Sequence, residues 1–475
     1  MPEAPRNVSD LVARAAAQAP DHLAFAEAST DVAVNWSKLD TAVDAEARRL
    51  LDLGIEPGDR VAIQLPTGLG FVTSLFGALR AGAIAVPMSA DLPERERTRL
   101  LEHSTPKVVV DQAPDIDAKA EPVRGAPGGE DIALLCYTSG TAGTPRGVML
   151  SHRAMLANVE QCAALRPAPV TSTDRVLLAV PLFHAYGLGP GLFQVAAAAA
   201  SGILMEHFSV EPALRTCEEF RITVIVGVPP MYAALTKVSG DRLDQALSTL
   251  RLLTSGAAPL EPSVLNAVRQ ATGLNVYEGY GLTETGPVLT STLVGGVAKP
   301  KSVGRPLPGV DLRLVDSDGE PGDDDESEDA GVVSVRGANL FSGYWPDGAH
   351  GPDAAGWFRT GDVGYLDDDG DLHLVDRAND LIIVNGFNVY PHEVEMVLSE
   401  LPEVVEAAAV GVPDERTGER VKAVLVVREG AELTEEKVFA HCAVRLAKFK
   451  IPGSVEFVDT LPHSATGKLR RASLR

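Results

Sequence analysis

The segment YTSGTAGTPRG, from Tyr137 to Gly147, carries the residue types best suited to binding phosphate. It holds three glycines, four Ser or Thr hydroxyls and one cation, Arg146. Glycines allow backbone N–H groups to turn toward an anion, while the hydroxyls and the cation add further donors. The segment is not a Walker A loop, because no Gly-Lys-Ser or Gly-Lys-Thr closes it. We therefore predict a phosphate-binding loop of another kind.

Two short apolar runs, at 132–136 and 148–150, flank this loop and are predicted to form buried strands. Helices and strands alternate along the chain as far as residue 290, an order that favours mostly parallel sheets covered on both faces. Strands are expected at 61–63, 84–86, 175–180, 203–205, 223–228 and 250–254, and helices at 39–53 after a capping Ser37, at 71–80 and around 195–200.

The pattern changes after Lys301, where short strands alternate with turns. The run at 316–329 holds nine acidic residues and is predicted to be a solvated loop. Roughly one hundred residues after Arg377 have helices and strands of their own, enough for a small domain. Its helices are expected at 391–401 and 434–446, and its strands at 407–410 and 421–427. We predict a large N-terminal domain of α/β layers with a β-rich subdomain, and a small α+β C-terminal domain.

Composition excludes several classes of partner. The 475 residues have a formal net charge of −23, which argues against binding to nucleic acid or an anionic membrane surface. The four cysteines (Cys136, Cys162, Cys217 and Cys442) lie far apart and lack metal-ligand spacing, so we expect neither disulfides nor a zinc site. Any polyanionic ligand must therefore be bound by a local site.

Targeting signals are not evident in the sequence. The N-terminal stretch lacks a basic leader followed by an apolar region, and no run of about 18 apolar residues occurs. A cytoplasmic protein without a membrane span is expected. The oligomeric state is left open, a homodimer included.

YTSGTAGTPRG resembles the phosphate loop of the adenylate-forming, or AMP-binding, superfamily, which includes acyl-CoA synthetases, peptide-synthetase adenylation domains and firefly luciferase. Further motifs similar to those of the family follow in order along the chain: PLFH at 181–184, SGAAP at 255–259, YGLTE at 280–284, FRTGD at 358–362, DR at 376–377, NGF at 385–387, and 462–468. On this basis the chain is identified as a member of the acyl-CoA synthetase, or fatty-acid–CoA ligase, branch. The resemblance implies an AMP-binding domain at 1–376, a hinge at 377–379 and a mobile domain at 380–475.

The resemblance also implies a two-step reaction. A carboxylate attacks the α-phosphorus of ATP to give an acyl-adenylate and pyrophosphate, and the thiol of coenzyme A then displaces AMP. Glu284 would bind Mg²⁺ and Thr283 the α-phosphate, where charge develops during transfer. Lys468 would serve the first step by cancelling repulsion between two anions. His184 would lie at the mouth of the acyl site.

The nucleotide and coenzyme sites are implied in the same way. Tyr280 would stack on adenine, while Asp362 and Arg377 would contact the ribose. Asn379 is the implied hinge residue. Gly386 and Phe387 would lie on the path of coenzyme A. The remaining ATP- or AMP-binding residues implied by the motifs are Thr138, Ser139, Gly140, Thr141, Gly143, Thr144, Arg146, Gly256, Ala257, Ala258, Glu278 and Gly279.

Three residues depart from the family pattern. Arg146 stands where lysine is usual, which keeps the charge but replaces a flexible point donor with a planar one. Ala142 removes a hydroxyl, and Asn379 replaces the usual Asp or Lys of the hinge. None of these changes is expected to abolish phosphate binding or hinge motion.

The substrate is predicted with less detail. Gly281 stands where acetate-specific members carry a tryptophan, and Gly279 is equally small, so the acyl pocket is expected to extend past acetate. A medium- to long-chain fatty acid is our first expectation, with aryl or malonyl-type acids behind it. The alternatives are an acyl-AMP ligase that loads a carrier protein, an amino-acid adenylation domain, and a non-catalytic regulator. The regulator is disfavoured because Lys468 and Glu284 are both present.

Overall fold

The computed structural model describes residues 4–138, 146–316, 330–377, 382–384, 387–414, 416–463 and 469–475. It divides into two compact units, one of Met1–Asp311 with Val335–Phe358, the other of Leu312–Ser334 with Arg359–Arg475. This division falls earlier than the predicted domains 1–376 and 380–475. The reason is that β18 (Leu372–Arg377) contacts helix α12 (Pro391–Ser399) of the C-terminal part. The predicted domain boundary and the hinge at 377–379 stay predictions.

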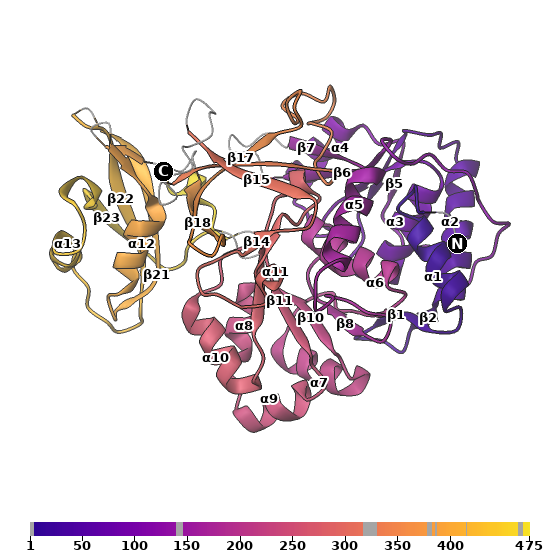
Figure 1. The fold of residues 1–475 in the computed structure, drawn as a ribbon, viewed down its shortest axis with the longest axis horizontal. Helices are drawn as coiled ribbons and strands as arrows, with labels where there is room; N and C mark the ends of the chain where they lie inside the picture. Colours follow the sequence, from indigo (N-terminus) through magenta and orange to yellow (C-terminus); the bar gives the residue numbers. More distant parts are fainter. Residues whose placement is uncertain are drawn as a thin grey trace. The chain divides into compact units, whose positions relative to one another are not determined.

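A nine-stranded sheet forms the larger part of the first unit (Figure 1). Its order is β14 (Arg305–Pro306), β13 (Thr290–Ser291), β12 (Val276–Tyr280), β11 (Leu252–Ser255), β10 (Val224–Gly227), β8 (Arg175–Leu178), β9 (Ser201–Leu204), β1 (Leu23–Glu27) and β2 (Ala33–Asn35). From β12 to β1 all neighbours are parallel. This confirms the strands predicted from apolar runs.

A five-stranded sheet carries the predicted phosphate loop. Its order is β5 (Val108–Val110), β3 (Arg60–Ile63), β4 (Ile84–Pro87), β6 (Ile132–Thr138) and β7 (Arg146–Ser151). All pairs are parallel except β6 with β7, which run antiparallel on either side of the loop. The expectation of mostly parallel sheets is therefore confirmed for both sheets of the first unit.

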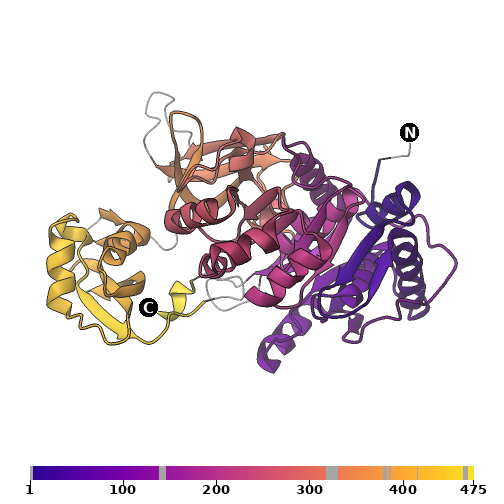
Figure 2. The same cartoon turned by 90° about the horizontal axis from the view of Figure 1, so that it is seen from below.

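Helices flank these sheets (Figure 2). They are α1 (Asp10–Gln18), α2 (Trp36–Asp52), α3 (Leu69–Arg80), α4 (Glu94–Ser104), α5 (His152–Ala163), α6 (Gln194–Ala197), α7 (Val210–Phe220), α8 (Pro229–Leu235), α9 (Gly240–Leu247), α10 (Pro262–Thr272) and α11 (Thr292–Gly295). The predicted cap of α2 was wrong by two residues. Asn35 caps the helix by accepting the Lys38 N–H at 2.8 Å, because the fully buried Trp36 already belongs to the first turn.

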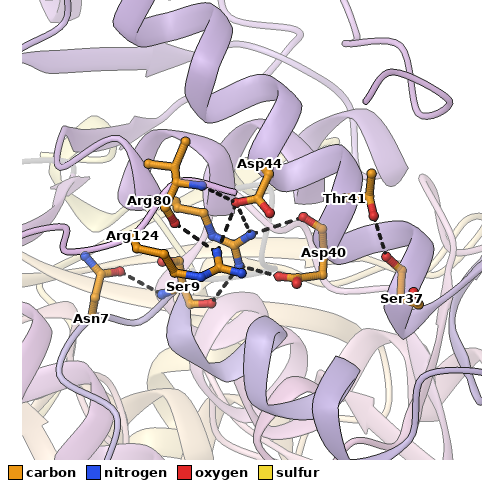
Figure 3. Close-up of polar contacts among 9 residues, drawn as sticks. Asn7, Ser9, Ser37, Asp40, Thr41, Asp44, Arg80 and Arg124 are labelled. Atoms are coloured by element: carbon orange, nitrogen blue, oxygen red, sulfur yellow. Dashed lines mark hydrogen bonds and ion pairs between the residues drawn. The ribbon is translucent and has the colours of Figure 1, made fainter. Parts of the chain in front are cut away.

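A buried ion-pair cluster joins α2 to α3 (Figure 3). The Arg80 guanidinium, 4% exposed, donates to Asp44 at 2.9 Å and lies 2.7 Å from the Asp40 carboxylate. The Val123 N–H also donates to Asp44, at 3.0 Å. Since residues 111–131 contain no helix or strand, this bond ties a long irregular segment to α2. The cluster therefore fixes three parts of the first unit.

The second unit contains two smaller sheets. A four-stranded sheet has the order β15 (Val310–Val315), β16 (Gly331–Gly337), β17 (Phe358–Leu366) and β18. The other has the order β20 (Phe387–Val389), β19 (Ile382–Val384), β22 (Gly418–Val427) and β21 (Val404–Asp414), with β23 (Ser454–Val458) beside β22. Helices α12 and α13 (Glu435–Ala443) share its core, which includes Leu398, Leu425 and Val438. The predicted α+β character is confirmed.

Among the described helices, none has the length and apolarity needed to cross a membrane.

Candidate active site

Two parallel strands bring the predicted nucleotide segments together. Strands β11 and β12 pair in register, with Ser255 opposite Glu278. The SGAAP motif begins at the end of β11, and Glu278, Gly279 and Tyr280 end β12. In open α/β sheets, ligands bind outside the carboxyl ends of such strands. The predicted adenine-binding segments therefore share one edge of the sheet.

The loop after β11 is shaped by close packing. Ala257 has a φ of 69°, in the left-handed region that costs a non-glycine residue energy. A Cβ on Gly256 would lie 2.8 Å from the Tyr186 ring, so only glycine fits there without movement. The sequence predicted small residues because adenine must approach closely. The structure shows that the ring of Tyr186 also packs against Gly256.

Glu278 is a buried carboxylate that holds this loop. It is 6% exposed, and its Oε2 accepts the Leu260 N–H at 3.0 Å. Burial raises the pKa of Glu278 to about 7, against a weaker opposing effect of the Leu260 hydrogen bond. We predicted Glu278 as part of the nucleotide site. Its described bond makes it a support for the loop between β11 and α10.

Glu284 lies on a short 3-10 helix, η2 (Thr283–Thr285), just beyond β12. Its Oε1 accepts a hydrogen bond of 2.8 Å from the hydroxyl of Tyr344, and its backbone carbonyl accepts the Phe341 N–H at 3.0 Å. Burial, followed by the neighbouring Glu284, raises the pKa of the Tyr344 phenol above its usual value, so the phenol keeps its proton and donates. The motifs did not include Tyr344.

The described ends of the phosphate loop face each other across the β6–β7 pair, where Thr138 lies opposite Arg146. The Arg146 guanidinium lies over the Tyr344 ring, with its Cζ 5.5 Å from the ring centroid. Arg146, Tyr344 and Glu284 therefore form one cluster. The predicted Ser139, Gly140, Thr141, Gly143 and Thr144 lie outside the described residues, as does Ala142.

His184 follows β8 and is half-buried. Its Nδ1 accepts the Tyr186 N–H at 3.1 Å, which in the neutral ring places the proton on Nε2. The neighbouring Leu182 N–H donates to the Thr67 hydroxyl at 3.1 Å, which fixes the PLFH segment to the start of α3. The place of His184 at the mouth of an acyl site stays a prediction.

The structure explains the absence of a side chain at Gly281 by backbone packing, whereas the sequence-based prediction related it to the acyl pocket. A Cβ at this position would collide with the backbone carbonyl of Pro287. Gly279 is less restricted, since its Cβ would meet the Thr290 carbonyl oxygen at 3.3 Å. The absence of a side chain at Gly281 is thus explained by backbone packing and is no measure of acyl-pocket volume. A role of either glycine in the pocket stays a prediction.

The predicted ribose residues belong to the second unit. Asp362 is 7% exposed on β17 and pairs in register with Arg377 of β18. The Asp362 N–H donates to the Thr360 hydroxyl at 3.1 Å. Neighbouring strands therefore place the two residues opposite each other, and their contact with a ribose stays a prediction. The side chains of Arg377 and Phe387 are not described, and Asn379, Gly386 and Lys468 lie outside the described residues.

Two places among the described residues could offer carboxylates to a divalent cation, the acidic turn between β17 and β18 and the cluster at Glu284. In the part of the chain that the structure describes, one group of three acidic residues could hold a metal, namely Asp367, Asp369 and Asp371. Asp367 already accepts the N–H groups of the other two at 3.0 Å each, which is the bonding of a tight turn. Mg²⁺ with a nucleotide commonly takes one or two protein carboxylates. That Glu284 supplies one stays a prediction.

Comparisons with known proteins agree with this arrangement. The AMP-binding enzyme model matches residues 12–345, and the AMP-binding enzyme C-terminal domain model matches residues 393–468. A feruloyl-CoA synthase of Amycolatopsis sp is 35% identical over 93% of this chain and 94% of its own. A long-chain-fatty-acid–CoA ligase of Mycobacterium tuberculosis is 32% identical over 99% and 98%. ATP-bound MatB from Rhodopseudomonas palustris superposes with a TM-score of 0.90 at 31% identity, over 99% and 98% of the two chains.

The chain belongs to the AMP-binding enzyme family. The enzyme class that the motifs predicted, AMP-forming acyl-CoA synthetase, is confirmed by the same matches. The predicted fold, with a large α/β N-terminal part and a small C-terminal part, is confirmed by the structural match. ATP and coenzyme A as co-substrates agree with the family.

Proposed function

We propose that the protein converts a carboxylic acid to an acyl-adenylate with release of pyrophosphate, and then to a coenzyme A thioester with release of AMP. One observation supports this most, the grouping of Glu284, Tyr344 and Arg146 just beyond the strands that carry the nucleotide motifs. This group offers a carboxylate for a cation and a guanidinium for a phosphate. Both are needed where a triphosphate is cleaved.

In the first step, each of the following residues would have a separate role. Arg146 would bind a phosphate oxygen through its planar fork, and Thr283 would donate its hydroxyl to the α-phosphate. Glu284 would hold Mg²⁺, which when bound spreads the charge that develops on the phosphate oxygens. Glu278 keeps the loop at Gly256 in place against the adenine position. Lys468 would neutralise the attacking carboxylate, a role that rests on the family motif alone.

A medium- to long-chain fatty acid remains our first proposal for the substrate. It is supported by the relative named as a long-chain-fatty-acid–CoA ligase. An aryl acid is the second candidate, because another relative is named as a feruloyl-CoA synthase. The small size of Gly281 no longer favours either, since backbone packing explains it. A malonyl-type acid, and a carrier protein as the acceptor, remain alternatives.

Release of pyrophosphate tests this proposal directly. The purified protein is given Mg²⁺ and ATP with a panel of acetate, decanoate, palmitate, ferulate and malonate, each with and without coenzyme A. We expect pyrophosphate release with one chemical class of acid, and thioester only when coenzyme A is present. Release without thioester would point to a carrier protein as acceptor. Absence of release with every acid in a folded, ATP-binding protein would contradict the proposed activity. A cytoplasmic location and a homodimer also stay proposals.

A further inference from the structure

Tyr344 lies between two opposite charges of the candidate nucleotide site. Its hydroxyl donates to Glu284 Oε1 at 2.8 Å, and its ring faces the Arg146 guanidinium at 5.5 Å. Among the described residues, no ion pair joins Arg146 to Glu284. A single phenol thus contacts the acidic group through its hydroxyl, and the basic group through both its ring face and its hydroxyl. Neither motif that supplies the charges contains this tyrosine.

The backbone around Tyr344 is fixed from both sides. Strand β7 bonds to this segment three times, from Met149 N–H to Gly343 O, from Ser342 N–H to Met149 O, and from Trp345 N–H to Gly147 O, at 3.1, 2.8 and 2.8 Å. The Phe341 N–H donates a hydrogen bond to the backbone carbonyl of Glu284. The Phe341 ring packs edge-on against the Tyr344 ring, with ring centroids 5.1 Å apart. The segment therefore connects the strand after the phosphate loop to the 3-10 helix η2.

Gly343 allows this path. Its φ of 101° lies in the region that favours glycine, and a Cβ there would collide with the Gly348 carbonyl. The chain then doubles back, so that Tyr344 bridges both Val148 and Ala349. The tyrosine side chain is aimed by these backbone contacts and has little freedom to leave the cluster.

We propose that Tyr344 is a positioning residue of the nucleotide site, which holds the Glu284 carboxylate by its hydroxyl and the Arg146 guanidinium by its ring. The inference rests on the proposed function. A carboxylate and a guanidinium at close range attract each other, and a direct pair would occupy the donors and acceptors that a metal–nucleotide complex needs. The phenol replaces that pair with a hydrogen bond to the carboxylate and with a contact of its ring and hydroxyl to the guanidinium, so both charges stay directed at the ligand.

Two variants separate the contribution of the Tyr344 hydroxyl from that of the ring. Tyr344→Phe removes the hydroxyl and keeps the ring, so it tests the hold on Glu284 while the ring still contacts Arg146. Tyr344→Leu removes both, so it also tests the hold on Arg146. Tyr365→Phe is the matched control, because that tyrosine stacks on His373 in the other unit. Isothermal titration of the full-length protein with an ATP analogue that carries an α,β-methylene group is run in excess Mg²⁺ and, separately, in EDTA.

We expect Tyr344→Phe to weaken binding about tenfold in Mg²⁺, the usual effect of a hydrogen bond to a charged group, and less than about twofold in EDTA. Tyr344→Leu should also lose about three- to fivefold in EDTA, since the stacking of Arg146 is gone. The Tyr365→Phe control should match the wild type under both conditions. Melting temperatures without ligand should stay within about 3 °C for the two Phe variants, which separates positioning from folding.

A double-mutant cycle with Glu284→Gln completes the test. If Tyr344 acts through Glu284, Tyr344→Phe should cost less than about twofold in the Glu284→Gln background. Equal costs in both backgrounds, or equal losses in Mg²⁺ and EDTA, would overturn the proposal and leave Tyr344 a packing residue. If the Gln variant binds too weakly to measure, the comparison of Mg²⁺ with EDTA decides alone. A wild type that fails to bind the analogue at all would instead refute the proposed function.

Discussion

Replacing Glu278 with glutamine should change how stability depends on pH. The folded protein raises the pKa of this carboxyl from 4.5 to about 7, chiefly through burial. Between these two values the folded state holds a proton that the unfolded state has released. Stability from this group is therefore complete below pH 4.5 and is lost as the pH rises toward 7. The slope is about 1.4 kcal/mol per pH unit, so the whole window amounts to about 3 kcal/mol as an upper figure.

Glutamine carries no charge at any pH, and its amide oxygen can still accept the Leu260 N–H. We expect Glu278→Gln to equal the wild type near pH 5 and to exceed it by about 2 to 3 kcal/mol at pH 8. Guanidinium unfolding of the full-length protein at half-unit steps from about pH 5 to about pH 8.5, without nucleotide, measures this difference.

His152 changes the stability of the protein with pH in the opposite direction to Glu278. Burial lowers the pKa of this imidazole to about 4 from 6.5, so its contribution to stability is lost as the pH falls below 6.5. The two residues thus have opposite slopes in the window that they share, and the wild-type curve alone is ambiguous. The difference between wild type and Glu278→Gln removes the His152 contribution, because both proteins contain it.

The matched control is Glu261→Gln, which removes an exposed carboxylate from the start of α10. Among the groups that shift the pKa of Glu278, Glu261 has the smallest effect, so its loss should leave the pH profile nearly unchanged. Parallel wild-type and Glu278→Gln profiles, offset by a constant amount at every pH, would refute the reasoning. Such a result would mean that Glu278 is ionised in the folded protein throughout the range.

Three further predictions concern Lys468, Gly386 and the buried ion pairs of Arg80. Lys468→Ala should slow adenylation about 100- to 1000-fold in single-turnover assays, while supplied acyl-adenylate is still converted to thioester; equal loss of both steps in a folded variant would contradict the two-step role. Gly386→Leu should show the reverse, with adenylate formed and thioester reduced, and loss of both would indicate misfolding. Arg80→Leu should cost about 3 kcal/mol of unfolding free energy, because it removes the buried guanidinium that pairs with Asp40 and Asp44 and leaves Asp44 with the exposed Arg124 and the Val123 N–H, against little change for the exposed Arg48→Leu.

Short sequence patterns predicted the parts of the fold that depend on interactions between residues near each other in the sequence. Strands β6 and β7 are short apolar runs on either side of a glycine-rich loop, and this pattern alone placed them. The cap of α2 shows where such signals become ambiguous. Asn35 and Ser37 are both good capping residues, and only the burial of Trp36 in the first turn decides between them.

Long-range contacts gave no such signal. Tyr344 is 60 residues from Glu284 in sequence, and nothing near either residue shows that they form a hydrogen bond. Gly281 shows a related limit. A glycine in a motif indicates that a side chain does not fit there, but only the structure shows that the Pro287 carbonyl lies where a Cβ would be; a role of Gly281 in the acyl pocket stays a prediction. Contacts between distant segments depend on the packing of the whole unit.

The two carboxylates of the EGYGLTE segment show how environment assigns roles within one motif. Glu278 is 6% exposed and bonds to a backbone N–H, so the cost of burying its charge makes it a poor ligand for a solvated cation. Glu284 is half-buried, and the phenol of Tyr344 bonds to one of its two carboxylate oxygens, Oε1. The same side-chain type therefore supports the loop at Glu278, whereas at Glu284 we propose that it binds Mg²⁺. Exchange of Glu278 should act first on stability, and exchange of Glu284 first on metal–nucleotide affinity.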